Sequence, residues 1–374
     1  MDIVKRDETK PEVRVASGEL SWQFFLDTRS AWQAMLDDCE QALVSIDLEQ
    51  FIFIPDQVGL KFAELLIKKA KQGVKVRVVM DAAGSFRFFT SPYLAAFSKQ
   101  GVEVKFYNPI DPWRIRNFSL WAFRDHRKLL IIDSRIVHLG GVGIEAAAAD
   151  WRDTNVRLMG TIVSEVKAEF ERMWLRIIEG GFRHSLRHPK ADGSPFIFLI
   201  NSPRFKKRFF YHELLTAIKR AKKYIYLTSP YFVPTQRLFF LLLRAARKKV
   251  DVRILIPDAS DHPIVDAAAR SFFTLALKSG IRLFRYPKKM LHVKTGVIDD
   301  IWAYIGSSNL DNMSTVFNHE ADLVSREVAM CAELKRHFFD DLTVSIEISQ
   351  EDWFRRPTYQ KVMEYLTWPL HGLL

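Results

Sequence analysis

The stretch HRKLLIIDSRIVHLGGVG, residues 126–143, recurs in outline as HVKTGVIDDIWAYIGSSN, residues 292–309. In both copies a histidine, a lysine and an aspartate keep the same spacing: His126, Lys128 and Asp133, then His292, Lys294 and Asp299. A pair of small residues follows at the same distance in each copy, Gly140-Gly141 and Gly306-Ser307. One such match in a chain of 374 residues is not rare, but two matched copies predict a duplication.

The spacing has a physical interpretation in an extended chain. Side chains alternate between faces along a strand, so the histidine and lysine of each copy project the same way. The apolar runs that follow, 129–132 and 295–298, are typical of buried strands. Two such strands brought face to face would place two imidazoles and two ammonium groups in one cleft. That cleft suits a phosphate, because lysines neutralise its non-bridging oxygens and histidines stand in line on either side of phosphorus.

The order of expected elements is also repeated. Each half reads as strand, helix, strand, helix, strand, which predicts a largely parallel sheet flanked by helices. A stretch rich in glycine, proline and charge, 180–195, is the expected junction. We therefore predict a duplicated α/β fold with mainly parallel or mixed sheets, divided into halves 1–185 and 186–374, with the two motifs at the interface between them. The expected strands and helices are 42–53, 60–71, 74–80, 224–227, 238–248 and 252–256.

Composition narrows the class of protein. The chain is 48% hydrophobic and 26% charged, as in an ordinary globular protein, and its two cysteines do not form a disulfide framework or metal site. The first twelve residues are polar, and no apolar window is long enough for a transmembrane helix, so we expect a cytoplasmic protein. An excess of 55 Lys and Arg over 44 Asp and Glu indicates an acidic partner, without separating lipid from nucleic acid.

The two motifs resemble those of the phospholipase D superfamily, whose members carry two such His-Lys-Asp motifs, and most closely those of bacterial cardiolipin synthases. The second motif fits throughout, with Asn309 and then Glu320 following. The first departs at Gly143, where the family usually has Asn, and the missing donor would lower the rate about ten- to a thousandfold if nothing replaces it. Nearly the whole chain, from about residue 21, carries the resemblance; further matching segments are 76–85, 124–128, 151–160 and 306–311.

The resemblance implies a two-step phosphodiester exchange without cofactor or metal. The family usually takes its nucleophile from the first motif, so His126 is expected to form a phosphohistidine and His292 to act as acid and base, although the reverse stays open. Glu320 is expected to orient His292, and Asp153, or less well Asp150, to orient His126. Phosphoryl oxygens are assigned to Lys128, Lys294 and Asn309, with Ser307 and Gly141 beside them, whereas Asp133 and Asp299 are expected to be mainly structural. Outside this set, we expect His138 to be packed, His262 to lie in a loop and His319 to face away.

Two stretches mix cations with aromatic rings, a pattern that suits an anionic membrane surface. The first is an insertion before the first motif with Trp113, Phe118 and Trp121, and the second contains Arg204, Lys206, Lys207 and Arg208. The alternative is that the rings pack inward and the charges are solvated. We expect peripheral association with the inner membrane.

Three functions follow from these patterns. The leading one is phosphatidyl transfer of cardiolipin synthase type to phosphatidylglycerol or a similar alcohol. Hydrolysis of phospholipid or nucleic acid at the same site is second, and a lipid- or nucleic-acid-binding protein that kept the fold is third. The synthase-like segments disfavour nucleic acid as partner. The lipid donor and the oligomeric state stay open.

Overall fold

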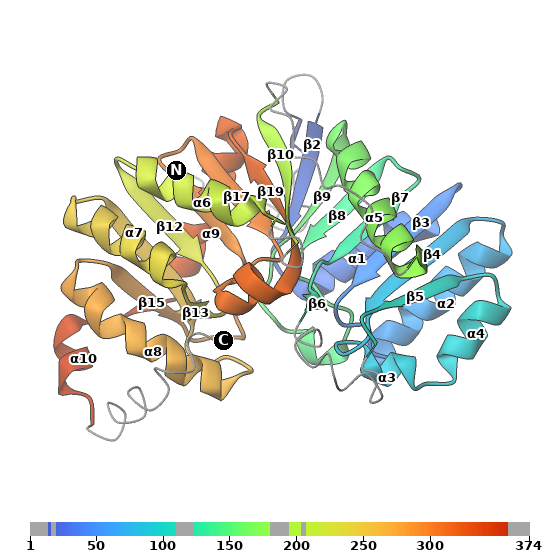
Figure 1. Cartoon of the computed structure of the whole chain (residues 1–374), viewed down its shortest axis with the longest axis horizontal. Coiled ribbons are helices and arrows are strands. Elements are labelled where there is room, and N and C mark those ends of the chain that lie inside the picture. Colours follow the sequence, from blue (N-terminus) through green and yellow to red (C-terminus); the bar gives the residue numbers. More distant parts are fainter. Residues whose placement is uncertain (1–13, 16–19, 110–122, 180–193, 203–206, 358–374) are drawn as a thin grey trace, which may run out of the picture.

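The computed structural model describes residues 14–15, 20–109, 123–179, 194–202 and 207–357. Figure 1 shows two α/β halves side by side, with strands of both halves meeting in the middle of the molecule. The first half contains β1 (Arg14–Val15), β2 (Leu20–Phe25), α1 (Thr28–Glu40), β3 (Ser45–Gln50), α2 (Gln57–Lys71), β4 (Lys75–Asp81), α3 (Phe86–Phe89), α4 (Tyr93–Lys99), β5 (Glu103–Tyr107), β6 (Arg124–Asp125), β7 (Leu129–Ile132), β8 (Ile136–Gly140), β9 (Asn155–Gly160) and α5 (Ile162–Glu179).

The second half repeats this order. It contains β10 (Phe196–Ser202), β11 (Lys207–Arg208), α6 (Phe209–Arg220), β12 (Tyr224–Thr228), β13 (Phe232–Val233), α7 (Gln236–Arg247), β14 (Asp251–Pro257), α8 (Pro263–Lys278), β15 (Arg282–Tyr286), β16 (Thr295–Ile298), β17 (Trp302–Gly306), β18 (Leu310–Asp311), β19 (Asn318–Ser325), α9 (Val328–Leu342), β20 (Ile346–Glu347) and α10 (Gln350–Arg355). Among the helices in the described ranges, none has an apolar run that could cross a bilayer.

Both sheets are mixed, which confirms the predicted fold class. The first has the order β1-β2-β9-β8-β7-β3-β4-β5, and the second β11-β10-β19-β17-β16-β12-β14-β15-β20. In each, three strands separated by helices run parallel, β3-β4-β5 and β12-β14-β15, and the hairpin that carries the histidine motif adds antiparallel strands beside them. The motif therefore enters each sheet next to its first parallel strand.

The first two long helices begin where an aspartate side chain caps them. Asp27 accepts a hydrogen bond from the Ser30 backbone at the start of α1, and Asp56 accepts from Val58 and Gly59 at the start of α2. These contacts satisfy backbone N–H groups that lack a partner inside the helix. The outer face of each sheet packs on its own apolar core. In the first half this core lies under α1 and α2, and in the second half it lies under α6, α7 and α8.

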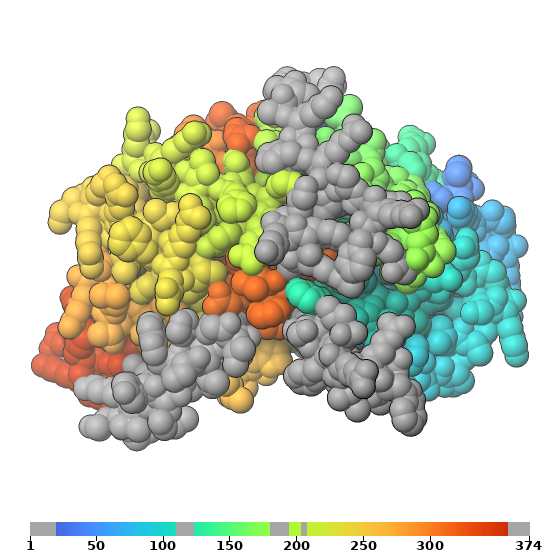
Figure 2. All heavy atoms as spheres, viewed as in Figure 1, coloured from blue at the N-terminus to red at the C-terminus, as the bar shows by residue number. Residues whose placement is uncertain are grey.

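The inner faces of the two sheets share one core. Trp22 of the first half packs against Phe196 of the second with ring centroids 5.9 Å apart, and its indole N–H donates to Glu333 at 3.0 Å. Arg152 forms a buried ion pair with Asp341 across the same boundary, 2.8 Å apart. In Figure 2, orange atoms of the second half adjoin green-cyan atoms of the first near the centre of the face. The interface between the halves is therefore part of the hydrophobic core.

The aspartates of the two motifs occupy equivalent turns. Asp133 and Ser134 have φ values of 51° and 53°, and Asp299 and Asp300 have 55° and 60°. Two consecutive residues with positive φ are the geometry of the tight hairpin that joins β7 to β8 and β16 to β17. The Asp133 carboxylate accepts from the backbone of residues 43–45, and that of Asp299 from residues 222–224. Each aspartate thus fixes the start of the first parallel strand of its half.

Candidate active site

The histidine of each motif is attached by its backbone to the other half of the molecule. The His126 N–H donates to the His319 carbonyl at 3.0 Å, where β6 runs parallel to β19. The His292 N–H donates to the Arg152 carbonyl at 2.8 Å, beside an isolated bridge between Arg152 and Leu291. The two arrangements are equivalent: the histidine segment of each half pairs with the backbone of the other half.

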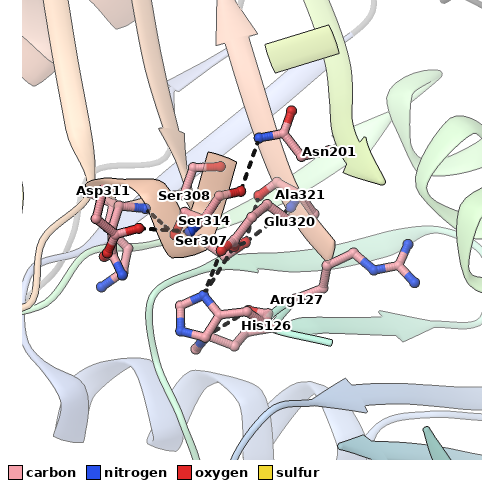
Figure 3. Close-up of polar contacts among 12 residues, drawn as sticks. His126, Arg127, Asn201, Ser307, Ser308, Asp311, Ser314, Glu320 and Ala321 are labelled. Carbon is pink, nitrogen blue, oxygen red and sulfur yellow. Dashed lines mark hydrogen bonds and ion pairs between the residues drawn. The ribbon is translucent and has the colours of Figure 1, made fainter. Parts of the chain in front are cut away.

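The carboxylate that orients each imidazole also comes from the other half. Nδ1 of His126 lies 3.0 Å from both carboxylate oxygens of Glu320, as Figure 3 shows, and Nδ1 of His292 lies 2.7 Å from Oδ2 of Asp153. The sequence interpretation paired Glu320 with His292 and Asp153 with His126, which is wrong. The reason is that each histidine is hydrogen-bonded through its backbone to the other half. The residue that accepts this bond directly precedes the carboxylate, so the carboxylate lies beside the histidine of the other half.

These contacts determine which ring nitrogen is available for chemistry. An ionised carboxylate only accepts, so Nδ1 carries the proton and Nε2 holds a lone pair. Burial, above all, lowers the pKa of His126 and of His292, which keeps both imidazoles neutral. Burial alone would raise the pKa of Glu320, but His126, Lys128 and the Ser307 hydroxyl outweigh it, so this pKa is lowered. Both rings therefore present Nε2 as a base or nucleophile.

The two lysines lie in equivalent positions but differ in access. Nζ of Lys128 donates to the carbonyl of His126 at 2.8 Å, and Nζ of Lys294 to the carbonyl of His292 at 2.7 Å. Lys128 lines the cavity, whereas Lys294 is almost completely buried. Burial lowers the pKa of Lys128 to about 7 and that of Lys294 to about 8. An anion between them would stabilise the charged forms, because opposite charge offsets the loss of water.

Both histidines open into one cavity of about 230 Å³ between the halves. Its wall includes Asn309, whose side-chain oxygen is buried without a hydrogen-bond partner in the described part of the chain. The remaining lining residues are Phe51, Ile52, Lys128, Gly141, Gly143, Glu145, Ala148, Trp151, Tyr231, Asp261, His262, Val265, Asp311, Met313 and Asn318. Two imidazoles, an ammonium group and an amide therefore converge on one enclosed space, which suits an anionic tetrahedral group.

Ser307 and Gly141 support the carboxylates. The Ser307 hydroxyl donates to Glu320 and accepts from the Ala321 backbone at 3.0 Å. At the equivalent point of the other half, a Cβ on Gly141 would lie 2.4 Å from a carboxylate oxygen of Asp153, so no side chain fits. The Ser307 hydroxyl thus contacts Glu320, and the assignment of Ser307 and Gly141 to the phosphate site stays a prediction.

Gly143, in contrast, has room for a larger residue. It lines the cavity, and a Cβ built on it would meet only Ile52, at 3.7 Å and beyond. Its carbonyl accepts from the Trp32 indole at 2.8 Å, which fixes the loop. The second motif supplies an amide side chain at Asn309. The equivalent position of the first motif, Gly143, has no side chain, although there is space for one.

Asp133 and Asp299 are not among the residues that line the cavity. Five residues of extended chain separate Lys128 from Asp133, or about 16 Å at the rise of a strand. The carboxylates act on the backbone at the far edge of each sheet, as described above. Both carboxylates contact the backbone rather than the cavity, and a mainly structural role stays the prediction for them.

Aromatic rings flank both imidazoles, and the motif pattern did not indicate them. The Phe51 ring lies edge-on to His126 at 5.0 Å between centroids, with Nζ of Lys128 5.4 Å from its centre. The Trp151 ring lies 4.9 Å from that of His292. Both rings exclude water from one side of an imidazole. Trp151 immediately precedes the Arg152-Asp153 pair, which is the only sequence signal for its position.

The other histidines fall outside the reacting pair. His138 is buried and bonded to Asp38 at 2.7 Å, so it is packed as expected. His262 lines the cavity from the loop before α8. His319 is buried against Tyr107 at 3.0 Å and faces away from the cavity. In the described ranges, no cluster of three or more His, Cys, Asp or Glu has the arrangement of a metal site.

The residues expected to contact a membrane are mostly not described. Trp113, Phe118, Trp121, Arg204 and Lys206 lie outside the described residues. Lys207 and Arg208 form the short strand β11, which pairs with β10, and the Arg208 side chain is half-buried. Their membrane contact stays a prediction.

The family described as "Cardiolipin synthase, PLD-like domain" matches the chain twice, over residues 35–174 and 214–342. The chain belongs to this family. It is a transferase of the phospholipase D superfamily, and the two matches contain the two histidine motifs. The chain is 30% identical to cardiolipin synthase A of Yersinia pseudotuberculosis over 372 residues and 29% identical to that of Escherichia fergusonii over 370. Both alignments cover 94% of this chain and 75% of the relative.

Solved structures show the same fold at low sequence identity. A phosphatidylserine synthase from Haemophilus influenzae superposes with a TM-score of 0.69 at 12% identity, over 94% of this chain and 95% of that one. A polyphosphate kinase from Porphyromonas gingivalis superposes with a TM-score of 0.62 at 13% identity, over 88% of this chain and 49% of the kinase.

Proposed function

We propose that this enzyme is a phosphatidyltransferase of cardiolipin synthase type. It moves a phosphatidyl group from one phospholipid to the hydroxyl of phosphatidylglycerol or a similar alcohol. The observation that carries the proposal is the meeting of His126 and His292 in one cavity, each oriented at Nδ1 by a buried carboxylate. The similarity to the cardiolipin synthases named above supports the choice of lipid as substrate.

The first chemical step forms a covalent intermediate. Nε2 of His126 attacks phosphorus, a P–N bond forms, and the P–O bond to the leaving alcohol breaks. His292 gives that alkoxide a proton. In the second step His292 removes a proton from the acceptor hydroxyl, whose oxygen attacks phosphorus and breaks the P–N bond, so His126 returns to its first state.

The electrostatics of the cavity support this cycle. Glu320 stabilises the positive charge that His126 acquires when it becomes phosphorylated, in the way a carboxylate stabilises an imidazolium in a catalytic triad. His292 is neutral in the empty cavity. An anionic phosphodiester bound beside Lys128 and Lys294 offsets their repulsion of a proton on His292, and so raises the pKa of this general acid. Substrate binding thus prepares the proton donor.

The acceptor decides between transfer and hydrolysis. Phe51 and Trp151 each cover one imidazole, and this exclusion of water favours attack by an alcohol. We expect the enzyme to work at the inner membrane surface from the cytoplasmic side, where both lipids are present.

The experiment is a lipid-exchange assay. Purified protein is incubated with vesicles that contain labelled phosphatidylglycerol, and the lipids are separated chromatographically. Cardiolipin formed by wild type and lost in His126→Ala supports the proposal. Phosphatidic acid as the sole product would mean that the enzyme is a hydrolase and not a transferase. Tight vesicle binding without turnover would mean that the protein binds lipid without catalysing its conversion.

A further inference from the structure

A short segment beside the cavity exposes aromatic rings to solvent. Phe86 is 56% exposed and Phe89 41%, both on α3, and Tyr93 at the start of α4 is 38% exposed. Arg87 lies exposed between the two phenylalanines. We call these four residues the mouth surface. Large exposed rings on one short segment indicate a surface that binds something apolar.

The mouth surface is joined rigidly to the wall of the cavity. The Ser85 hydroxyl donates to the carbonyl of Phe51 at 2.9 Å and accepts from the backbone of Phe53 at 3.0 Å. Gly84 approaches the same carbonyl so closely that a Cβ would lie 2.3 Å from it. Phe51 lines the cavity beside His126. The start of α3 is therefore held against the cavity wall beside His126.

The strand before His126 is attached to the same segment. One oxygen of the Asp81 carboxylate accepts from the Asp125 backbone at 2.9 Å, and the other accepts from Ala83 at 2.9 Å. Asp125 immediately precedes the catalytic histidine. The loop 81–85 thus connects the mouth surface to the histidine strand as well as to the wall.

The opposite rim of the cavity also exposes an apolar side chain. Ile264, at the start of α8, is 62% exposed and lies in the chain between His262 and Val265, which both line the cavity. Figure 1 shows α3 and α8 along the same side of the molecule. Exposed apolar side chains therefore flank the cavity from both halves.

Charge distinguishes the two rims. Residues 82–102 contain no Asp or Glu and carry the cations Arg87 and Lys99. The corresponding stretch of the second half, 258–280, contains three aspartates, Asp258, Asp261 and Asp266, and two cations, Arg270 and Lys278, so its formal charge is −1. An anionic surface attracts the first stretch more strongly than the second, so it would engage the mouth surface first.

We propose that the mouth surface docks the enzyme on an anionic bilayer, with the rings of Phe86 and Phe89 inserted at headgroup level and Ile264 as the second contact. The opening of the cavity then faces the lipid headgroups, and a phosphodiester enters it without the whole lipid leaving the bilayer. The proposal rests on the proposed function, because it takes the substrate to be a bilayer lipid. Rings at the interface with a cation between them have the composition of such contacts.

The test uses a single fluorescent label. Cys39 and Cys331 are both buried, so a thiol introduced by Phe86→Cys is the reactive one among the described residues. The matched control is Leu43→Cys, at a position 81% exposed that precedes β3, at the opposite edge of the same sheet from Phe51. An environment-sensitive dye on each variant is followed as vesicles of phosphatidylglycerol are added, with iodide as an aqueous quencher.

We expect the emission at position 86 to shift to the blue and iodide quenching there to fall at least threefold, while the label at position 43 is unchanged. Equal responses at both positions, or a response at neither while the vesicles sediment the protein, would overturn the proposal. A shift that follows protein concentration without vesicles would assign the surface to a second copy of the chain, and would also overturn it.

A second measurement separates this proposal from the proposed function. Phe86→Ala should lower vesicle binding about tenfold, since the exposed part of the inserted ring no longer leaves water. Its turnover of a short-chain phosphatidylglycerol below the micellar concentration should stay at the wild-type level. If wild type has no lipid activity, the label and sedimentation results still decide the docking surface. If Phe86→Ala binds vesicles as wild type does, the docking proposal fails while the transferase assignment is untouched.

Discussion

Replacing Glu320 by glutamine tests the exchange of carboxylates between the halves. The substitution keeps the shape of the side chain and removes its charge. Both carboxylate oxygens lie 3.0 Å from Nδ1 of His126, so any orientation of the new amide loses the charge that stabilises the phosphorylated ring. If the amide nitrogen faces Nδ1, the proton moves to Nε2 and the nucleophile is blocked.

The size of the effect follows from these two orientations. Loss of a partner that orients a histidine costs about 10- to 100-fold, and a wrong tautomer in a catalytic triad about 10⁴-fold. We therefore expect formation of the phosphohistidine to slow by about 10²- to 10⁴-fold in Glu320→Gln. The assay is a single-turnover reaction with phosphate-labelled lipid, quenched with acid, with the labelled peptide identified by mass spectrometry.

Asp322 provides the matched control. It lies on the same strand, is equally buried, and accepts from the backbone and hydroxyl of Ser308 rather than from a histidine. Burial raises the pKa of Asp322 well above its ordinary value, and Asp322→Asn keeps the shape of a side chain that contacts Ser308 and no histidine. We expect labelling in this variant to stay within about threefold of wild type.

The position of the label completes the test. If wild type is labelled on His126, Glu320→Gln must suppress the label. If the label is found on His292, the roles of the histidines are reversed and Asp153→Asn must suppress it. Normal labelling of His126 in Glu320→Gln would refute the exchange of carboxylates, whichever histidine the family uses.

Three further outcomes follow from the site. Gly143→Asn should fold, because the cavity has room at that position, and should raise the transfer rate about tenfold or more by supplying the missing amide donor; an unchanged rate would mean that a backbone group already serves. On the acid side kcat/KM should decline with a midpoint below pH 6.5, the ordinary histidine pKa, because one imidazole must be neutral. On the alkaline side kcat/KM should decline above about pH 7, where Lys128 in the free enzyme loses its proton. Lys128→Arg keeps its charge, so it should move only the alkaline limb, to higher pH. Asp133→Ala should lower the free energy of unfolding by about 1–3 kcal/mol, measured by denaturation, since it removes the acceptor of three backbone N–H groups far from the cavity.

The sequence was a sufficient guide to the fold class, and it identified the two histidine motifs that the structure brings together. The convergence of the two motifs was predicted, and the structure shows both histidines in one cavity, although each histidine and lysine precedes its strand instead of alternating along it. The apolar runs after each lysine are the buried strands β7 and β16. These predictions succeeded because strand periodicity and apolar burial are local properties, which a chain displays in its own order of residues.

The pairing of His126 with Glu320 could not be predicted in the same way. A motif search assigns each carboxylate to the half in which it occurs, or leaves the choice open, because spacing along the chain contains no information about contacts between halves. The same limit applies to Phe51, which contacts His126 only because β3 ends beside the histidine segment that pairs with the other half. Contacts that depend on how two similar units pack are tertiary properties, and they appear only when both units are placed in space.

The exchange has a consequence for how the site forms. Neither half alone holds an oriented histidine, because the backbone acceptor and the carboxylate of each ring belong to the other half. The apolar core that the inner faces share contains Trp22 and Phe196 from opposite halves, so the packing that stabilises the fold also brings the four catalytic groups together. A substitution in that core, such as Trp22→Ala, should therefore reduce activity together with stability, whereas a substitution in an outer core should leave the geometry of the two histidines intact until the protein unfolds.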